Sequence, residues 1–473
     1  MIALQNLFDR IVQRVNINLR EMDYNVSPLL DNLIPIEKLL KFYAVYGISA
    51  HHLLDLRFKH SNLGGSYFLG KCHVSNSLLY KSDIRGDELK KKGDVFRYKD
   101  LEIPLFTDEG IEIENSFLVK TLVHCFSHDP ETLENFYITN TISSHYTNIH
   151  GSPIDGSFLG PFATVDLTTM NDCVIGAFTY IQAGEVSHLN IAPGTIWIRS
   201  PGEFDFLYKY PQEALGRYIN FSAGRPPRGL LIDFVRDRKT EFDRLFNSIN
   251  FESSVPVPDS ASLDRFAVCV PKIHIDDNVL VAQHAYLENT RMGKGANAQE
   301  NCYIINSRLK GCNVTAHGAK IIEADLEENV FVGFNSFLRG RENGRLNIGQ
   351  NSIVMPHTII DIEESLTIPA GHIIWGLITN RKELETNSIS IAELSKFKGT
   401  LTRGDMTFEG NGKSLTEAFQ ARIHHILEAN GAFYDGTTNE GHAQKNQKIS
   451  YNMIHPYPDG ELQGLYPTIT IQP

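Results

Sequence analysis

Cysteine is scarce in this sequence, which has six in 473 residues and no two at the Cys-x-x-Cys spacing of zinc and redox motifs. A chain of this length buries enough apolar surface to fold without disulfides, so we expect its thiols to stay reduced. This use of cysteine excludes a small disulfide-framed protein and indicates a cytoplasmic one.

Long hydrophobic runs and an excess of positive charge are also missing. No stretch of 18 apolar residues occurs, so no segment is expected to span a membrane. The N-terminal "MIALQNLFDRIVQRV" carries Asp9 and Arg10 within its apolar pattern and does not have the composition of a signal peptide. The net charge of −12 argues against a nucleic-acid partner, which normally requires a basic face. We therefore expect a small-molecule substrate, with neither a membrane nor a nucleic acid as partner.

What the sequence has instead is a repeat. From residue 284 it divides into segments of seventeen residues, "HAYLENTRMGKGANAQE", "NCYIINSRLKGCNVTAH", "GAKIIEADLEENVFVGF" and "NSFLRGRENGRLNIGQN". One aliphatic column holds Leu287, Ile304, Ile321 and Leu338, and a second holds Met292, Leu309 and Leu326. A column of small residues holds Ala285, Cys302, Ala319 and Ser336. An aliphatic residue therefore recurs every five or six positions.

This period fits neither a helix, with 3.6 residues per turn, nor an ordinary strand, with a period of two. It fits a coil with three short flat sides, each of which points one aliphatic side chain inward. Successive coils would stack at the spacing of neighbouring strands, roughly 4.8 Å, around a continuous aliphatic core. Each buried Ile or Leu contributes about 1.5–3 kcal/mol, so a single coil is unstable and a stack is stable.

The first half of the chain repeats the pattern. "LGPFAT", "VDLTTM", "IGAFTY", "IQAGEV" and "IAPGTI" begin at Leu159, Val165, Ile175, Ile181 and Ile191, and weaker copies lie at 67–89 and 346–376. These segments resemble the repeats of the hexapeptide-repeat superfamily. The resemblance implies a mainly β fold, the left-handed parallel β-helix, whose handedness is opposite to the usual right-handed crossover between parallel strands.

The regions around the coils give the expected domain organisation. Helical N- and C-terminal elements and helical insertions are predicted, in keeping with the caps that a solenoid needs. The predicted regions are a helical N-terminal region at 1–62, a first β-helix part at 63–200 with an insertion at 90–140, a helical insertion at 201–262, a second β-helix part at 263–380, and a C-terminal helical cap and tail at 381–473.

Two short motifs resemble those of the γ-class carbonic anhydrases. "YIQAGEVSH", residues 180–188, contains Gln182 and, at the position of a zinc ligand in that family, His188. "SDIRGDE", residues 82–88, matches the family's arginine and aspartate that pair near the subunit interface, here Arg85 and Asp87.

The sequence departs from that family at the metal ligands. Ala183 replaces the aspartate that follows the glutamine, and Tyr210 and Leu215 stand where the family has two further histidines. Because a catalytic zinc needs three protein ligands, we expect no metal site, and a γ-carbonic-anhydrase-like metal protein is the least favoured hypothesis. His124 and His128 have metal-like spacing but no third ligand near them in the sequence.

Acyltransferases of the superfamily use a histidine to take a proton from a hydroxyl or amine, which then attacks a thioester. "NVTAHGAK" places His317 at a coil edge beside Gly318, whose missing side chain leaves room for a ligand. The predicted catalytic residues are His317 and His188, and the predicted substrate or interface residues are Arg85, Asp87, Gln182 and Gly318. No cofactor is expected to be bound, and acyl-CoA or an acyl carrier would be the co-substrate.

The last predicted coil ends differently from that of many acetyltransferases of the superfamily. In "TIPAGHIIWGLITN", the residues Leu377, Ile378 and Thr379 replace the Pro-Ala-Lys that lies against the CoA. "GNGKS" at 410–414 is not a phosphate-binding loop, because Thr407 occupies the position of its first glycine.

Two functions of different classes remain open. One is an acyl- or acetyltransferase acting on a sugar, a nucleotide sugar or a small amine, and the other is a non-catalytic β-helical binding or scaffold protein. A carboxylate or amide beside a candidate histidine would favour the enzyme, and a solitary solvated histidine would favour the scaffold. We expect a homotrimer, as is usual in the superfamily, although the insertions, the helical ends or the other half of the solenoid could cover the same side.

Overall fold

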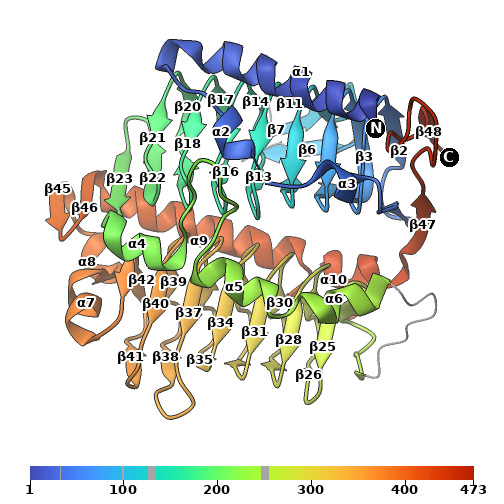
Figure 1. The fold of residues 1–473 in the computed structure, drawn as a ribbon. Helices are drawn as coiled ribbons and strands as arrows, with labels where there is room; N and C mark the ends of the chain where they lie inside the picture. The colour runs from blue at the N-terminus through green and yellow to red at the C-terminus, as the bar shows by residue number, and fades with distance from the viewer. Residues whose placement is uncertain (32, 99–100, 126–134, 247–254) are drawn as a thin grey trace. The chain divides into compact units, whose positions relative to one another are not determined.

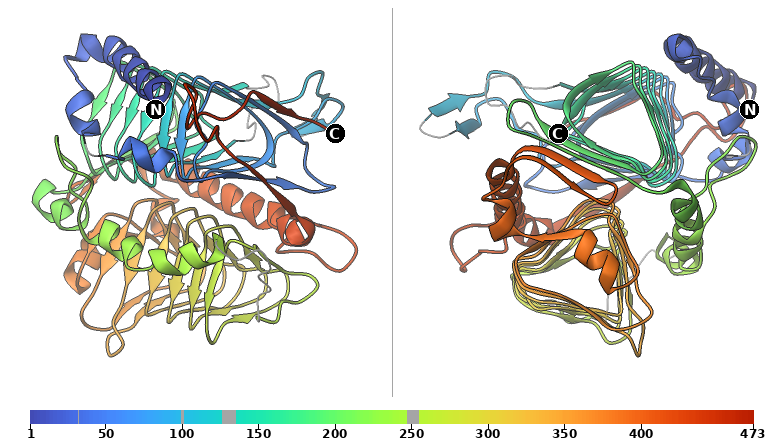
Figure 2. Two further views of the ribbon diagram at one scale, coloured as in Figure 1. Left: turned by 45° about the vertical axis from the view of Figure 1, so that its right-hand side comes forward. Right: turned by 90° about the vertical axis from the view of Figure 1, so that its left-hand side faces the viewer.

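The computed structural model describes residues 1–31, 33–98, 101–125, 135–246 and 255–473. Unit 1 comprises residues 1–195, 212–232 and 449–473, and unit 2 comprises residues 196–211 and 233–448. Each unit contains a stack of parallel β coils with three flat sides, which Figure 2 shows from the end. Within the described part of the chain, no helix is both long enough and apolar enough to cross a membrane.

The coils of unit 1 have three sides, named 1A, 1B and 1C. Side 1A consists of β5 (Asp83–Gly86), β10 (Leu122–His124), β13 (Asn148–His150), β16 (Thr164–Asp166) and β19 (Tyr180–Gln182). Side 1B consists of β2 (Asp55–Lys59), β8 (Gly110–Glu114), β11 (Asn135–Thr139), β14 (Ile154–Asp155), β17 (Thr168–Asn171) and β20 (Gly184–Ser187). Side 1C consists of β4 (Leu78–Tyr80), β9 (Phe117–Val119), β12 (Ile142–Ser143), β15 (Phe158–Leu159), β18 (Val174–Ile175) and β21 (Asn190–Ile191). The long strand β3 (Tyr67–Ser75) pairs first with β5 on side 1A and then with β2 and β8 on side 1B.

The aliphatic residues of the first-half repeats stack as neighbours in these coils. Leu159 pairs in register with Ile175, which pairs with Ile191, and Val165 pairs with Ile181. Leu159, Val165, Ile175 and Ile181 are fully buried. One coil of unit 1 therefore takes sixteen residues.

A long helix covers side 1C. Helix α1 (Ile2–Asn18) runs along the stack of coils (Figure 1). Its apolar face packs on outward residues of side 1C, among them Phe117, Ile142 and Phe158. The rings of Phe8 and Phe117 meet edge to face at 5.5 Å. The short helices α2 (Ser27–Leu30) and α3 (Ile36–Leu39) contribute Leu30 and Leu39 to the same cluster. The helix thus buries a side of the coil that would otherwise expose large apolar residues.

Unit 1 differs from the sequence prediction at two places. The predicted insertion at 90–140 contains coil strands, because β8, β9, β10 and β11 pair in parallel with their neighbours. Ile113, Leu118 and Val123 are buried and keep the spacing of five residues. The antiparallel hairpin of β6 (Val95–Tyr98) and β7 (Leu101–Pro104) is inserted before them, so the repeat does not continue at a constant interval from the preceding coil. The predicted helical region 1–62 ends in two strands, β1 (Ala44–Ile48) and β2, which pair with β3.

Unit 1 closes with the C-terminal residues of the chain. The strand β47 (Ser450–Ile454) pairs antiparallel with β1, and β48 (Ile469–Ile471) pairs antiparallel with β2. The C-terminal tail therefore forms a strand, β48, that pairs with β2 of the first coil, where an unpaired edge would favour association with another chain.

The coils of unit 2 have three sides, named 2A, 2B and 2C. Side 2A consists of β24 (Ser262–Leu263), β27 (Leu280–Val281), β30 (Asn297–Ala298), β33 (Val314–Thr315), β36 (Phe331–Val332), β39 (Ile353–Val354) and β42 (His372–Ile374). Side 2B consists of β25 (Val268–Val270), β28 (Tyr286–Glu288), β31 (Tyr303–Ile305), β34 (Lys320–Ile322), β37 (Phe337–Arg339), β40 (Ile359–Asp361) and β43 (Leu377–Ile378). Side 2C consists of β26 (His274–Ile275), β29 (Arg291–Met292), β32 (Arg308–Leu309), β35 (Ala324–Leu326), β38 (Leu346–Ile348) and β41 (Leu366–Ile368).

The predicted columns of unit 2 are confirmed. Leu287, Ile304, Ile321 and Leu338 pair in register along side 2B, and all four are fully buried. Met292, Leu309 and Leu326 do the same along side 2C. The small residues Ala285, Cys302, Ala319 and Ser336 are fully buried at the corner before side 2B. Small side chains at these corners allow the chain to turn sharply while the interior stays closely packed.

Helices cover two sides of unit 2. Phe419 of α9 (Gly412–Ala429) contacts Phe331 on side 2A, with ring centroids 6.2 Å apart. Phe234 at the end of α5 (Leu230–Arg236) and Phe242 of α6 (Lys239–Phe246) pack on Tyr303 of side 2B. The aromatic contacts hold these helices against flat β surfaces whose outward residues are also aromatic.

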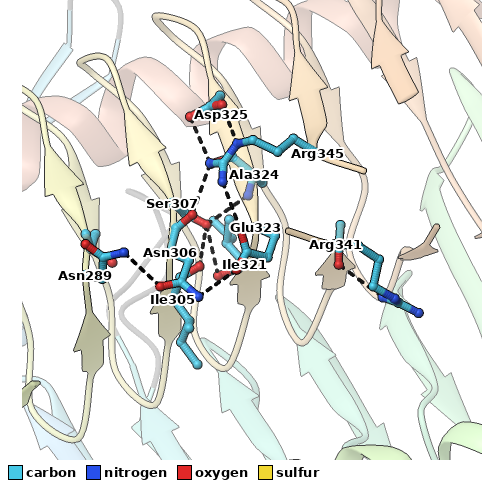
Figure 3. A network of polar contacts seen from close by, with 12 residues as sticks. Asn289, Ile305, Asn306, Ser307, Ile321, Glu323, Ala324, Asp325, Arg341 and Arg345 are labelled. Carbon is cyan, nitrogen blue, oxygen red and sulfur yellow. Dashed lines mark hydrogen bonds and ion pairs between the residues drawn. The ribbon is translucent and has the colours of Figure 1, made fainter. Parts of the chain in front are cut away.

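One coil of unit 2 is five residues longer than the two coils before it. Leu338 pairs with Ile360, 22 residues later, whereas the earlier steps of the column are 17 residues. The extra residues form the loop around 340–345, and Arg345 fixes it to the preceding coil (Figure 3). Its guanidinium donates to Asp325 at 2.8 Å and to Glu323 at 2.9 Å. Next to it, Asn289 donates to Asn306 at 3.0 Å and Asn306 to Glu323 at 2.6 Å, which ties the corners of three coils together.

The regions predicted as a helical insertion at 201–262 and a helical cap at 381–473 contain strands as well as helices. The strand β23 (Phe204–Lys209) pairs antiparallel with β46 (Met406–Asn411), which pairs with β45 (Lys398–Arg403). The other elements are α4 (Gln212–Tyr218), β22 (Thr195–Ser200), α7 (Arg381–Thr386), β44 (Ser388–Ser390), α8 (Ile391–Leu394), α10 (His442–Lys445), and the 3-10 turns at Leu19–Met22 and Asn446–Lys448.

Candidate functional site

His317 lies at the corner between β33 and β34 of unit 2. The Glu300 carboxylate of the preceding coil lies 2.7 Å from Nδ1 of His317, at the distance of an ion pair although without the direction of a hydrogen bond. On the other side, the ring of Phe334 from the next coil lies 5.4 Å from the imidazole ring. His317 and Glu300 are both buried. A carboxylate at this distance can stabilise the positive charge that an imidazole gains when it accepts a proton as a general base.

Gly318 adopts a left-handed backbone conformation, with φ of 73°. Its N–H donates to the carbonyl of Glu300 at 2.9 Å. The corresponding corners of neighbouring coils are also left-handed, at His284, Asn301, Asn335 and His357. The glycine therefore meets a backbone requirement of this corner. Its predicted role in leaving room for a ligand stays a prediction.

Lys320 is a third ionisable residue close to His317 in the chain, and it was not predicted. Its side chain is buried, and its Nζ donates to the carbonyl of Gly318 at 2.5 Å. Burial lowers the pKa of Lys320 from 10.5 to about 8, while the neighbouring Cys302 acts in the opposite direction. The ring of Tyr303 lies 5.8 Å from Nζ. The lysine therefore changes charge much closer to neutral pH than an exposed one does.

His188 has different surroundings. It lies after β20 in unit 1, and about half of its side chain is exposed. Nδ1 lies 2.6 Å from Ser187 Oγ, and Nε2 lies 3.7 Å from carboxylate oxygens of both Glu21 and Asp172. Its φ of 54° continues a column of left-handed corners at Asn76, Asn115, Asn140, Gly156 and Asp172. The histidine thus occupies a turn position of the repeat, on the surface.

The predicted pair of Arg85 and Asp87 is present in unit 1. The Nε of Arg85 donates to Asp87 Oδ1 at 2.9 Å, and a second nitrogen of the guanidinium donates to the other carboxylate oxygen. Both side chains are almost completely buried. Their predicted place at a substrate or subunit interface stays a prediction.

Arg85 begins a ladder of polar residues along side 1A. Arg85 pairs in register with His124, His124 with His150, and His150 with Asp166. Nδ1 of His150 is hydrogen-bonded to Asp166 at 2.8 Å, and Asp166 also accepts the hydroxyl of Tyr180. Gln182 ends the ladder, where its side-chain oxygen lies 3.0 Å from the hydroxyl of Tyr180. The structure thus brings Arg85, Asp87 and Gln182 to one side of unit 1, together with two histidines that were not predicted as functional.

The pair of His150 and Asp166 in the ladder and the pair of Glu300 and His317 in unit 2 share a spacing that is visible in the sequence. His150 and Asp166 are sixteen residues apart, which is one coil of unit 1. Glu300 and His317 are seventeen residues apart, which is one coil of unit 2. Polar residues that recur at the coil period are neighbours in space, so reading the columns for polar as well as aliphatic residues would have found both pairs.

In many acetyltransferases of the superfamily, a Pro-Ala-Lys segment after the last coil lies against CoA. In unit 2, the chain takes a different course at this point. Leu377 and Ile378 form β43, which pairs with β40, and Ile378 is buried. The hydroxyl of Thr379 donates to Glu383 at 2.8 Å at the beginning of α7. The chain therefore turns into a helix where the Pro-Ala-Lys of the family would lie.

Comparison with known proteins agrees with the coil architecture. Residues 101–223 match the family model described as a hexapeptide repeat including loop. A crystal structure of a "putative acetyltransferase" from Desulfovibrio desulfuricans G20 is 49% identical in sequence, covers 100% of this chain and 99% of its own, and has a TM-score of 0.93. The chain belongs to the hexapeptide-repeat superfamily. A Bacillus cereus protein of the same description is 14% identical over 40% of this chain, and its TM-score of 0.22 is too low to bear on this member of the superfamily. No curated protein matches the chain.

Proposed function

We propose that this protein is an acyltransferase, specifically an acetyltransferase, and that His317 is its general base. The description of the Desulfovibrio relative supports the transferase class, because nearly the whole of both chains is alike. The contact between Glu300 and His317 carries the assignment of the base, since a solitary solvated histidine would instead fit a scaffold. The acceptor is a sugar, a nucleotide sugar or a small amine, and the donor is acyl-CoA or an acyl carrier.

In the proposed reaction His317 takes the proton from the acceptor hydroxyl or amine as its oxygen or nitrogen attacks the thioester carbonyl. Glu300 stabilises the imidazolium that forms, because opposite charges at this distance attract strongly in a buried site. The carbon–sulfur bond then breaks, the acyl group stays on the acceptor, and the imidazolium returns its proton to the leaving thiolate. No net proton is left on the enzyme after one cycle.

The proposal extends to assembly, location and handedness. Following the superfamily, we propose left-handed coils, a homotrimer and a cytoplasmic location. Arg85, Asp87, Gln182 and Gly318 are proposed to line the substrate site or a subunit interface.

The test of the base compares two histidines that the sequence ranked alike. With acetyl-CoA and a panel of sugar, nucleotide-sugar and amine acceptors, we expect His317→Ala to lower the release of free CoA thiol by about a hundredfold or more, as for the loss of a general base. Glu300→Gln should lower it less, because the base remains. His188→Ala is the matched control and should keep full activity, since its side chain is half-exposed.

Three outcomes would contradict this function. Full activity of His317→Ala would remove His317 as the base. Loss of activity in His188→Ala alone would identify His188, at the corner after β20, as the catalytic histidine instead. No acetyl transfer by the parent protein with any acceptor, together with no thermal stabilisation by acetyl-CoA, would favour the scaffold.

A further inference from the structure

Two buried histidines, His124 and His150, lie next to each other on side 1A of unit 1, and a carboxylate lies beside the first. The two rings meet edge to face with centroids 5.2 Å apart, and a nitrogen of one lies within 4.8 Å of a nitrogen of the other. The Glu88 carboxylate lies 3.4 Å from Nε2 of His124. His124 and His150 are buried, and the Glu88 side chain is one-fifth exposed.

We propose that His124, His150 and Glu88 bind a divalent transition-metal ion, in the first place zinc. Two imidazoles and one carboxylate form a known set of protein ligands for a zinc ion that keeps one position open. Imidazole nitrogen and carboxylate oxygen also suit cobalt and nickel, whereas magnesium and calcium prefer oxygen alone. This inference does not rest on the proposed transferase activity.

The distance between Glu88 and His124 fits shared coordination better than direct hydrogen bonding. A hydrogen bond between nitrogen and oxygen is normally 2.7–3.2 Å long. Two ligand atoms about 2.0–2.1 Å from one tetrahedral zinc are roughly 3.3 Å apart. The observed 3.4 Å matches that separation, so a zinc ion placed beside these two atoms needs little movement of either.

Asp166 supplies the outer partner that metal-binding histidines usually have. It accepts a hydrogen bond from Nδ1 of His150 at 2.8 Å, and in the neutral imidazole this leaves Nε2 as the nitrogen that can bind a metal ion. Asp166 has no exposed surface and is held in turn by the hydroxyl of Tyr180. A carboxylate in this position fixes the ring orientation and makes the histidine a stronger ligand.

The coil explains why sequence spacing did not indicate this site. His124 and His150 are 26 residues apart, but adjacent strands β10 and β13 place them directly side by side. The sequence paired His124 with His128 instead, and His128 lies outside the described residues. Glu88 comes from the coil before His124, directly after the strand β5 that pairs with β10.

The test measures metal on the full chain. After reconstitution with zinc and dialysis, we expect about one zinc ion per chain by elemental analysis, and cobalt in its place should give the intense visible absorption of a four-coordinate ion. His124→Ala and His150→Ala should each lose the bound metal. Asp166→Asn should keep the site but weaken zinc binding by about 10–100-fold.

The control is His188→Ala, because His188 also lies near two carboxylates but is half-exposed. This variant should retain the metal. Loss of metal in His188→Ala but not in His150→Ala would overturn the proposal, as would a parent protein that retains no zinc or cobalt. If an alanine variant fails to fold, His150→Gln keeps a polar side chain of similar size and gives the same test. A metal-binding protein without transferase activity would leave this inference standing and contradict only the proposed function.

Discussion

At the scale of single residues, Lys320 is the buried cation whose effect on stability depends most clearly on pH. Its pKa is about 8 in the folded protein, against 10.5 for an ordinary lysine. Below pH 8 the lysine is charged in both the folded and the unfolded state, and the full penalty of burying the charge is present. Between the two pKa values the folded protein gives up the proton while the unfolded chain keeps it, so stability rises with pH.

We therefore expect Lys320→Met to be more stable than the parent at pH 7, by up to roughly 3 kcal/mol according to the size of the pKa shift. The advantage should shrink above pH 8 and disappear near pH 10.5. Urea unfolding at pH 7 and at pH 10.5 measures the difference. Lys310→Met, which removes an exposed lysine paired with Glu327, should show no such trend. A difference that is the same at both pH values would show that burial of the charge is not its origin.

The candidate histidines show how far single residues could be predicted. The motif around His317 was visible in the sequence, but its partner Glu300 lies one coil earlier and has meaning only when coils are aligned. His188 fits a family motif equally well, yet the structure places it in a column of surface turns. A motif identifies a residue type at an interval, whereas burial and charged neighbours depend on residues far away in the sequence.

At the scale of elements, the stacking of inward aliphatic side chains from neighbouring strands stabilises the coils. Ile321 lies in the middle of the confirmed column of side 2B, between Ile304 and Leu338, and is fully buried. We expect Ile321→Asp to lower the free energy of unfolding by more than about 4 kcal/mol, because it removes apolar burial and places a charge in the coil interior. Thermal or urea unfolding of the full chain measures it.

Ile322→Asp is the matched control. Ile322 is the next residue of β34, points to the other side of the strand and is only partly buried. The same charge there should cost much less, since it keeps contact with water. If both variants unfold alike, the cost belongs to the strand backbone and not to the inward position.

The strands that sequence analysis missed have a common cause. The coil formed by β8, β9 and β10 carries aliphatic residues at the expected spacing. The hairpin inserted before it lengthens the interval from the preceding coil, so the columns no longer align at a constant period. The five added residues around 340–345 lengthen the interval again in unit 2, where the Arg345 contacts hold the loop. Regular coils could be predicted from composition and period, and insertions could not, because their ends are set by side-chain contacts between coils.

At the scale of the whole molecule, the covered and open sides of the coils decide where a trimer could form. Side 1C is covered by α1, side 2A by α9, and side 2B by α5 and α6. Side 1B carries Tyr137, a large aromatic residue with about half of its surface exposed. Side 2C carries the exposed Arg291 and Arg308. Aromatic residues are enriched at protein interfaces, so side 1B is a better candidate than side 2C for a contact between subunits, in addition to side 1A with its pair of Arg85 and Asp87.

The proposed homotrimer predicts a particle of about 160 kDa, three times the 53.2 kDa of one chain. Light scattering on the purified protein measures this mass. If side 1B forms the contact, Tyr137→Asp should reduce the particle to a single chain, because the change removes the exposed aromatic ring and adds a carboxylate beside Glu112. Arg308→Asp, on side 2C, is the control and should leave the trimer intact. A parent protein of 53 kDa would remove any site between subunits and would require the substrate to be held by residues of a single chain.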